Sequence, residues 1–201
     1  MRIRASGLAC VRGGREVFRD VSFVVGPGEA LLVTGPNGAG KSSLLRLVAG
    51  LLRPAGGRIE LEGGGPDLPL AEQALYLGHL DALKPALSVR ENLAFWAQFL
   101  GNAAVNPEPA LAAVGLGALA RIPAIYLSAG QRRRLALARL IAITRSIWLL
   151  DEPTAALDAA GRKMLADLLR TQLSNGGIVL AATHDPLGLE NPMELRLGGN
   201  R

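Results

Sequence analysis

The octapeptide Gly35-Pro36-Asn37-Gly38-Ala39-Gly40-Lys41-Ser42 matches the pattern G-x-x-x-x-G-K-[ST] at every defined position. It follows the unbroken apolar run Ala30–Thr34 (ALLVT), which indicates a buried parallel strand. It precedes a predicted helix from Lys41 to about Leu52, ended by Arg53-Pro54. A glycine-rich turn in this place lets backbone N–H groups surround phosphate oxygens, and the helix N-terminus adds a positive dipole end. The sequence therefore predicts a phosphate-binding loop.

Three side chains of this loop have predicted roles toward a nucleoside triphosphate. We expect Lys41 to reach the β- and γ-phosphates, the Ser42 hydroxyl to ligate Mg²⁺, and Ser43 to contact the α-phosphate. A chance glycine-rich turn is the alternative interpretation. The preceding strand and the Lys-Ser pair directly after the last glycine disfavour this alternative. We therefore expect ATP and Mg²⁺ as cofactors.

A pair of carboxylates further along the chain supplies the second half of the predicted site. Asp151 and Glu152 directly follow Ile147–Leu150 (IWLL), a second predicted buried strand. A carboxylate at the tip of a neighbouring strand can hold the Mg²⁺ shell opposite Ser42, so we assign Asp151 to the metal. Glu152 is then placed to orient the attacking water or to accept its proton. An ordinary acidic pair at a strand end is the competing interpretation.

The composition excludes several other classes of protein. The chain has 201 residues, 49% of them hydrophobic and 19% charged, and a single cysteine, Cys10. These values exclude a disordered chain and a disulfide scaffold. No apolar run of about 18 residues occurs, and the first residues contain no apolar signal segment, so we expect a cytoplasmic protein. We expect Cys10 to pack as a small apolar residue, and with no second cysteine or clustered histidines nothing suggests metal ligation by these side chains.

The net charge of +5 leaves two interpretations open. The 22 basic residues are spread along the chain, and the one tight cluster is Arg132–Arg134. They form either a solvated basic surface or a surface that contacts lipid head groups or nucleotide phosphates.

Strand and helix signals alternate along the chain, which predicts an α/β fold with a mainly parallel sheet. Capping boxes at Ser88–Glu91 and Ser128–Gln131 predict two helix starts. Residues from about 85 to 142 carry only helical signals, so we expect a helical lobe there and a nucleotide-binding core at about 1–84 and 143–201, within one domain. The other predicted elements are strands at Val21–Val25, Arg58–Glu62 and Ile178–Ala182, and helices at about 88–100, 128–143 and 158–173.

Further motifs follow in a fixed order: Leu127-Ser128-Ala129-Gly130-Gln131, then Asp151-Glu152-Pro153-Thr154 with Ala156-Leu157-Asp158, then Thr183-His184-Asp185. Together with the phosphate loop they resemble the LSGGQ signature (with one conservative change), the Walker B and D-loop pair and the switch histidine of ATP-binding cassette (ABC) proteins. The resemblance covers about residues 2–197. It implies a P-loop NTPase core of the RecA-like type, with N-terminal antiparallel strands and an ABC-type helical lobe.

The resemblance to ABC proteins also implies roles for individual residues. Glu152 would serve in hydrolysis, His184 would contact the γ-phosphate, and Asp158 would belong to the D-loop. The signature residues Ser128–Gln131 would act in trans, on the ATP of a partner. Each motif occurs once in this sequence. The resemblance therefore implies a head-to-tail homodimer with two ATP molecules between its subunits.

The sequence departs from the ABC pattern at two places. An aromatic residue that stacks on adenine is usual upstream of the phosphate loop, and Val11-Arg12 occupies that place here. The Arg12 guanidinium plane can stack on a base instead. The usual Q-loop glutamine is replaced by His79, within Leu77-Gly78-His79-Leu80. A neutral histidine, like glutamine, has one acceptor and a donor, so we expect His79 to act as the neutral tautomer at this position.

Three stretches resemble a narrower group, the ATP-binding subunits of bacterial cytochrome c biogenesis (haem exporter) systems. They are Leu77–Pro85, Ser88–Leu100 and Leu127–Leu135. This resemblance implies integral membrane partners of the CcmB and CcmC type and a peripheral location on the cytoplasmic face of the inner membrane. The work implied is the release of a haem-loaded chaperone for cytochrome c maturation.

Two other functions stay open at this point. One is a small ABC transporter ATPase for another substrate. The other is a soluble ABC ATPase that acts on ribosomes or DNA; such proteins usually carry two cassettes or inserted coiled coils, which this sequence lacks, so we expect no nucleic-acid partner.

The aromatic residues Phe95, Trp96 and Phe99 are either core of the helical lobe or the border of a groove for a partner helix.

Overall fold

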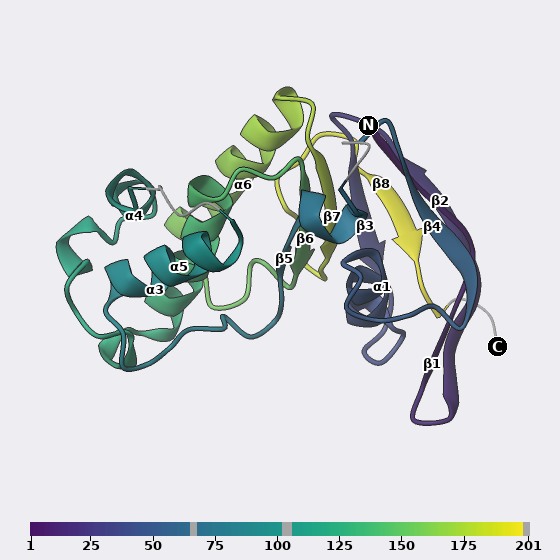
Figure 1. Ribbon diagram of the computed structural model, residues 1–201, viewed down its shortest axis with the longest axis horizontal. Helices are drawn as coiled ribbons and strands as arrows, with labels where there is room; N and C mark the ends of the chain where they lie inside the picture. The colour runs from purple at the N-terminus through teal and green to yellow at the C-terminus, as the bar shows by residue number, and fades with distance from the viewer. Residues whose placement is uncertain (65–67, 102–105, 199–201) are drawn as a thin grey trace.

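The computed structural model describes residues 1–64, 68–101 and 106–198, and its strands form two sheets (Figure 1). The larger sheet is parallel, in the order β5-β6-β7-β3-β8, and the smaller is antiparallel, in the order β2-β1-β4. The predicted α/β fold with a parallel core sheet and N-terminal antiparallel strands is confirmed. The strands are β1 Arg2–Arg12, β2 Arg15–Val25, β3 Ala30–Thr34, β4 Gly56–Glu62, β5 Ala74–Leu77, β6 Ile147–Asp151, β7 Ile178–Ala182 and β8 Met193–Arg196.

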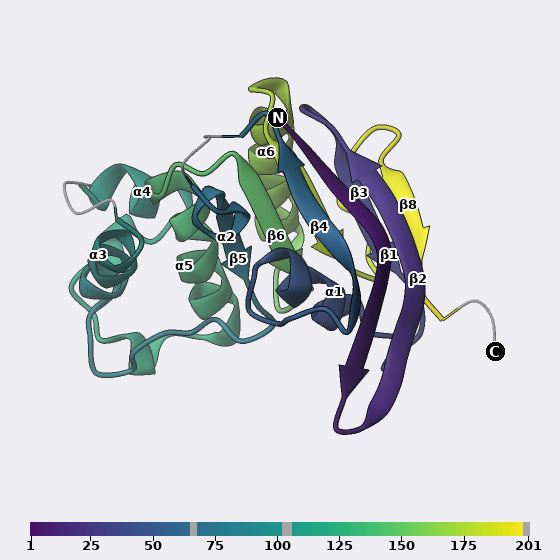
Figure 2. The ribbon, with the colours of Figure 1, turned by 45° about the vertical axis from the view of Figure 1, so that its right-hand side comes forward.

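Helices cover both faces of the parallel sheet. Helix α1 lies between the two sheets, and α6 lies against the opposite face (Figure 2). Helices α3, α4 and α5 gather beside β5, at the left of Figure 1. Within the described ranges, no helix is both long and apolar enough to span a bilayer. The helices are α1 Lys41–Val48, α2 Leu70–Gln73, α3 Val89–Phe99, α4 Glu108–Ala113, α5 Ala129–Ala142 and α6 Ala159–Ser174, with 3₁₀ turns at Gly117–Leu119 and Ala124–Tyr126.

Strand β6 divides the apolar core into two clusters. Ile147 and Leu149 pack with α1 and the antiparallel sheet, whereas Trp148 and Leu150 pack with α5 and α6. All five residues of β6 are buried. A strand buried on both faces is apolar without alternation, which is why its sequence is a continuous run.

The predicted helix starts are confirmed, and one helix end is wrong. Both capping boxes are present, with Ser88 paired to Glu91 and Ser128 paired to Gln131. The helix that follows the phosphate loop ends at Val48 rather than near Leu52. Gly50 has a φ of +70°, which no continuing helix can contain.

Asn92 on α3 is a buried polar side chain that ties this helix to the loop before it. Its Oδ1 accepts from the N–H of Lys84 at 2.8 Å, and its Nδ2 donates to the carbonyl oxygens of Lys84, Leu87 and Ser88 at 3.0 Å. The Asn92 side chain has no exposed surface. The hydrogen bonds therefore provide partners for the donor and acceptor groups of this buried amide and join α3 to the loop before it.

We expect Asn92→Ala to lower the free energy of unfolding by about 2 kcal/mol, because it removes the hydrogen bonds of a buried amide and leaves the Lys84 N–H without its acceptor on Asn92. Asn175→Ala is the matched control: Asn175 is exposed and caps the end of α6 through its backbone. The control should change the free energy of unfolding by less than about 0.5 kcal/mol. Urea unfolding followed by circular dichroism measures both values, and equal effects would contradict the assignment.

Candidate active site

The phosphate loop joins β3 to α1, and the shape of the surrounding chain requires glycine at two of its positions. Gly35 has a φ of +129°, and a Cβ there would lie 2.3 Å from the carbonyl oxygen of Leu197, just after β8. Gly40 has a φ of +99°, and a Cβ there would lie 2.5 Å from Cγ1 of Val17 on β2. A side chain at either position would push the loop away from its neighbours.

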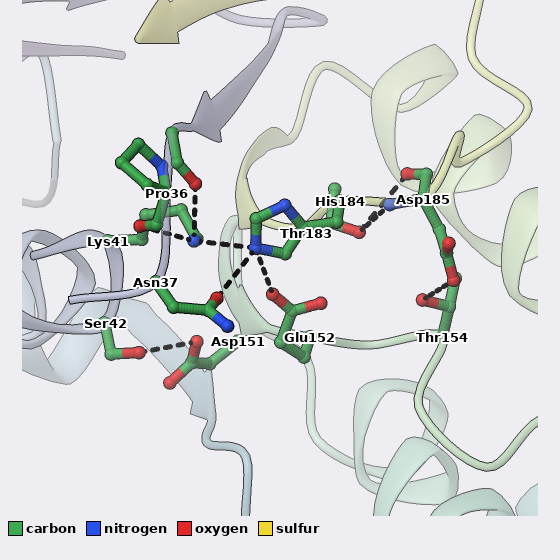
Figure 3. A network of polar contacts seen from close by, with 11 residues as sticks. Pro36, Asn37, Lys41, Ser42, Asp151, Glu152, Thr154, Thr183, His184 and Asp185 are labelled. Carbon is green, nitrogen blue, oxygen red and sulfur yellow. Dashed lines mark hydrogen bonds and ion pairs between the residues drawn. The ribbon is translucent and has the colours of Figure 1, made fainter. Parts of the chain in front are cut away.

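Lys41 is buried and directs its ammonium group across the loop (Figure 3). Its Nζ donates to the carbonyl oxygens of Gly35 at 2.8 Å and Pro36 at 3.3 Å, and lies 2.8 Å from Nε2 of His184. Because a lysine ammonium group only donates, Nε2 of His184 is the acceptor in this contact. Oδ1 of Asn37 lies 3.2 Å from the same nitrogen. The loop after β7 thus brings His184 against the phosphate loop.

Ser42 and Asp151 meet at the start of α1. The Ser42 hydroxyl donates to Oδ1 of Asp151 at 2.9 Å, and the Asp151 side chain is buried at the end of β6. The Tyr76 hydroxyl donates to Oδ2 of Asp151 at 3.4 Å and accepts from Nε of Arg46 at 3.3 Å. Burial raises the pKa of Tyr76, which keeps its hydroxyl protonated as a donor. The sequence motifs predict Ser42 and Asp151 here, whereas no motif indicates Tyr76 or Arg46.

Glu152 occupies the turn that follows β6, with an unusual backbone. Its φ is +47°, in the left-handed region. Its N–H donates to the carbonyl oxygen of Ala182 at 2.8 Å, which joins the turn to the end of β7. Its carboxylate Oε1 lies 3.8 Å from Nε2 of His184, as Figure 3 shows. A partly exposed carboxylate therefore faces the phosphate loop.

A cavity of about 580 Å³ lies over the phosphate loop, and we call it the phosphate cavity. The predicted residues Ser43, Arg12 and His79 all line it, together with Asp151 and Glu152. Arg12 comes from the end of β1 and His79 from the segment after β5. The structure therefore brings together the predicted loop, metal, base and Q-loop residues on one cavity.

The signature residues Ser128–Gln131 lie elsewhere. Among the residues that the structure describes, none of these four lines the phosphate cavity. The Ser128 hydroxyl caps α5 by accepting from the N–H of Gln131 at 3.2 Å. A Cβ on Gly130 would lie 3.0 Å from the carbonyl oxygen of Ala156, so the signature packs closely against the predicted D-loop.

Asp158, the predicted D-loop aspartate, caps the start of α6. Its carboxylate accepts from the N–H of Gly161 at 2.8 Å and pairs with Arg134 of α5 at 2.7 Å. These hydrogen bonds lower the pKa of Asp158. In this chain Asp158 therefore joins the signature helix to α6 rather than lining the phosphate cavity.

Arg133 differs from the surface arginine that the basic cluster predicts. Its side chain is buried, pairs with Asp81 at 3.1 Å and donates to main-chain oxygens around Glu152. A helical signal was present in the sequence. Arg133 lies four and seven residues before Leu137 and Leu140, which places it on the buried face of α5.

A second cavity, of about 540 Å³, lies between α1 and α3, and we call it the apolar groove. Leu51, Leu80 and Phe99 line it and are 61%, 79% and 68% exposed. Trp96 stands against Phe99 with ring centroids 5.6 Å apart. Trp96 and Phe99 therefore border a groove, as one of the two interpretations predicts, although Trp96 also packs against the apolar core and Phe95 does not line the groove. Of the residues that line the phosphate cavity, Arg46 and His79 also line this groove.

Comparisons with known proteins agree with this geometry. The family described as "ABC transporter" matches residues 18–155. A protein of Nitrobacter winogradskyi named "Cytochrome c biogenesis ATP-binding export protein CcmA" is 60% identical over 199 residues, 99% of each chain. The solved structure of a putative ABC transporter ATP-binding protein from Pyrococcus furiosus has a TM-score of 0.82 at 22% identity and covers 98% of both chains.

A third similar protein is an ATP-binding cassette solved as a dimer in a post-hydrolysis state with ADP and Pi. It has a TM-score of 0.77 and 25% identity, over 91% of this chain and 88% of that one. The family match covers more than half of the chain, and the identity to the Nitrobacter protein extends over nearly all of it. The chain belongs to the ABC transporter family of ATPases and, within that family, to the CcmA group of cytochrome c biogenesis ATP-binding export proteins.

Proposed function

We propose that this chain is the ATP-hydrolysing subunit of a bacterial membrane complex for cytochrome c biogenesis, which exports haem or releases a haem-loaded chaperone. The name of its 60% identical relative supports the export system. One observation supports the ATPase activity above all. Four side chains meet around the phosphate loop: Lys41, Asp151, Glu152 and His184.

Mg²⁺ fits the oxygen atoms beside the loop. The Ser42 hydroxyl and an Asp151 carboxylate oxygen lie 2.9 Å apart. Mg²⁺ at nucleotide sites takes one or two protein oxygens together with phosphate and water oxygens, so these two residues would hold it. The bound ion would neutralise charge on the transferred phosphoryl group. Tyr76 donates to the other oxygen of Asp151 and so fixes the orientation of the carboxylate.

Hydrolysis of ATP to ADP and phosphate needs a water in line with the γ-phosphate and an acceptor for its proton. Glu152 lines the phosphate cavity, and we assign it to orient this water and to take its proton. Lys41 supplies positive charge to the β- and γ-phosphate oxygens. His184 lies within 3.8 Å of Glu152 and beside Lys41, where a ring N–H can donate to the γ-phosphate.

We infer that two copies of the chain complete each site. The signature lies apart from the phosphate cavity of its own chain, and a 25% identical cassette is a dimer with ADP and Pi. The Ser128 hydroxyl and the free N–H groups at the start of α5 suit a partner's γ-phosphate. Asp158 would lie near the same interface. The whole chain would act as one domain, with a core at about 1–84 and 143–201 and a helical lobe at about 85–142.

Two residues of the phosphate cavity replace the usual ABC side chains. Arg12 is proposed to hold the adenine through its guanidinium plane. His79 is proposed to take the place of the Q-loop glutamine, with one ring nitrogen as donor and the other as acceptor. Because His79 lines both the phosphate cavity and the apolar groove, it is placed to connect them.

The apolar groove is the proposed contact with the integral membrane subunits, of the CcmB and CcmC type. Exposed Leu80 and Phe99 suit the apolar face of an amphipathic helix, and loops between membrane helices supply such segments. This contact would hold the chain on the cytoplasmic face of the inner membrane. The basic surface of the chain, with a net charge of +5, favours approach to anionic lipid head groups.

We expect Glu152→Gln to reduce ATP turnover by about two orders of magnitude or more, because the amide cannot accept the proton of water. ATP affinity should stay within about threefold, since Lys41 and the loop are unchanged. Steady-state ATPase assays and nucleotide titration measure the two effects. Glu190→Gln, at an exposed glutamate, is the control and should leave turnover unchanged. Near-normal turnover of Glu152→Gln would show that the assigned role is wrong.

We expect Leu80→Asp to shift a tagged chain from the membrane fraction to the soluble fraction, because it places a charge in the apolar groove. Leu68→Asp is the matched control, since Leu68 is also exposed but does not line the groove. Cell fractionation with and without the membrane subunits measures both. Sedimentation with membranes that does not depend on these subunits, or equal release of both variants, would count against the proposed contact.

A further inference from the structure

Glu152 has a backbone conformation that side-chain-bearing residues rarely adopt, and hydrogen bonds hold it from two sides. Its N–H donates to the carbonyl oxygen of Ala182 on β7 at 2.8 Å. Its carbonyl oxygen accepts from Nη2 of Arg133 on α5 at 2.6 Å. Because the backbone angles of a residue set the direction of its Cα–Cβ bond, these two hydrogen bonds control where the Glu152 carboxylate points.

Arg133 contacts the whole turn after β6. Its Nη2 also donates to the carbonyl oxygen of Asp151 at 3.0 Å, and its Nε donates to that of Pro153 at 3.2 Å. The planar guanidinium group of Arg133 therefore bonds three consecutive carbonyl oxygens, those of Asp151, Glu152 and Pro153. The Arg133 side chain is 3% exposed, so water does not compete for these hydrogen bonds. Arginine is the residue whose donors lie in a fixed plane suited to this arrangement.

The other edge of the guanidinium group contacts the segment that carries His79. Nη1 of Arg133 donates to the carbonyl oxygen of Gly78 at 3.1 Å and pairs with Oδ1 of Asp81 at 3.1 Å. Asp81 supplies the opposite charge that a buried arginine requires. Arg133 therefore joins the signature helix, the segment after β5 and the turn that carries Glu152.

We propose that Arg133 is a positioning residue for ATP hydrolysis, which holds the backbone of Glu152 and so aims its carboxylate into the phosphate cavity. This proposal rests on the role of Glu152 proposed above. Within the described residues that line the phosphate cavity, Arg133 is absent, so it acts through main-chain atoms. Loss of its hydrogen bonds should impair the chemical step more than nucleotide binding, because Lys41 and Ser42 keep their places.

The test is the ATPase kinetics of Arg133→Lys, with ATP affinity and Tm measured on the same preparation. Lysine keeps the charge opposite Asp81, but its single nitrogen cannot reach the carbonyl oxygens of Gly78 and Glu152 together. We expect kcat to fall by about tenfold or more, as a displacement of about 1 Å at a reacting group allows. KM and the ATP Kd should change by less than about threefold.

Arg139→Lys is the matched control. Arg139 lies on the same helix, is 4% exposed and donates to the carbonyl oxygen of Asp81 at 2.8 Å. Its other partners are the carbonyl oxygen of Ala136 and the ring of Trp96, not the turn after β6. This variant measures the general effect of changing a buried arginine on α5. Its kcat should stay within about twofold of the wild-type value, whatever its Tm.

Arg133→Gln is a second variant, which removes the buried charge at this position and serves where the lysine variant does not fold. We expect its kcat to fall while its ATP Kd stays unchanged. An unchanged kcat in the Arg133 variants would overturn the proposal. So would equal losses of kcat, ATP affinity and Tm in the Arg133 and Arg139 variants, since these indicate a structural role only. Glu152→Gln is assayed in parallel. If Glu152→Gln keeps its turnover, the proposed role of Glu152 in hydrolysis is wrong. If Glu152→Gln loses turnover while the Arg133 variants keep theirs, only the positioning role of Arg133 is wrong.

Discussion

One strand register holds the active site together: Ala182 on β7 pairs with both Val33 on β3 and Asp151 on β6. Because the three strands are parallel, the segments that follow them leave the same edge of the sheet. Those segments are the phosphate loop, the turn with Glu152 and the loop with His184. A slip of one residue would turn a whole strand's side chains to the opposite face. The two faces of β6 pack in different core clusters, with Trp148 and Leu150 on one side and Ile147 and Leu149 on the other, so a slip would disrupt both and change the distances in the site.

The elements that the sequence predicts best are those fixed by burial alone. β3 and β7 have the predicted bounds, because each is an unbroken apolar run between a glycine-containing turn and a polar segment. β8 was missed, because this edge strand (MELR) alternates in burial and has few apolar residues. β5 has only four residues and follows a glycine-rich and proline-rich stretch. Short strands at sheet edges depend on their neighbours more than on their own sequence.

The side chains that support the site were harder to predict than those expected to meet ATP. Lys41, Asp151 and His184 belong to motifs that a local pattern identifies. The basic cluster predicts an exposed Arg133, whereas its position on the buried face of α5 places it inside the protein. Tyr76 contacts Asp151, 75 residues further along the chain, and no local pattern indicates a contact at that separation. A motif predicts the groups that meet the substrate, whereas the groups that orient them depend on tertiary packing.

In the proposed dimer, each chain supplies a phosphate loop to one ATP and a signature to the other. The most direct measurement is the ATPase activity of a mixture of Lys41→Ala and Ser128→Arg chains, each inactive alone. In a mixed dimer, one composite site combines the intact loop of one chain with the intact signature of the other. We expect mixing to restore activity. A mixture no more active than its separate components, under conditions where the chains associate, would contradict it.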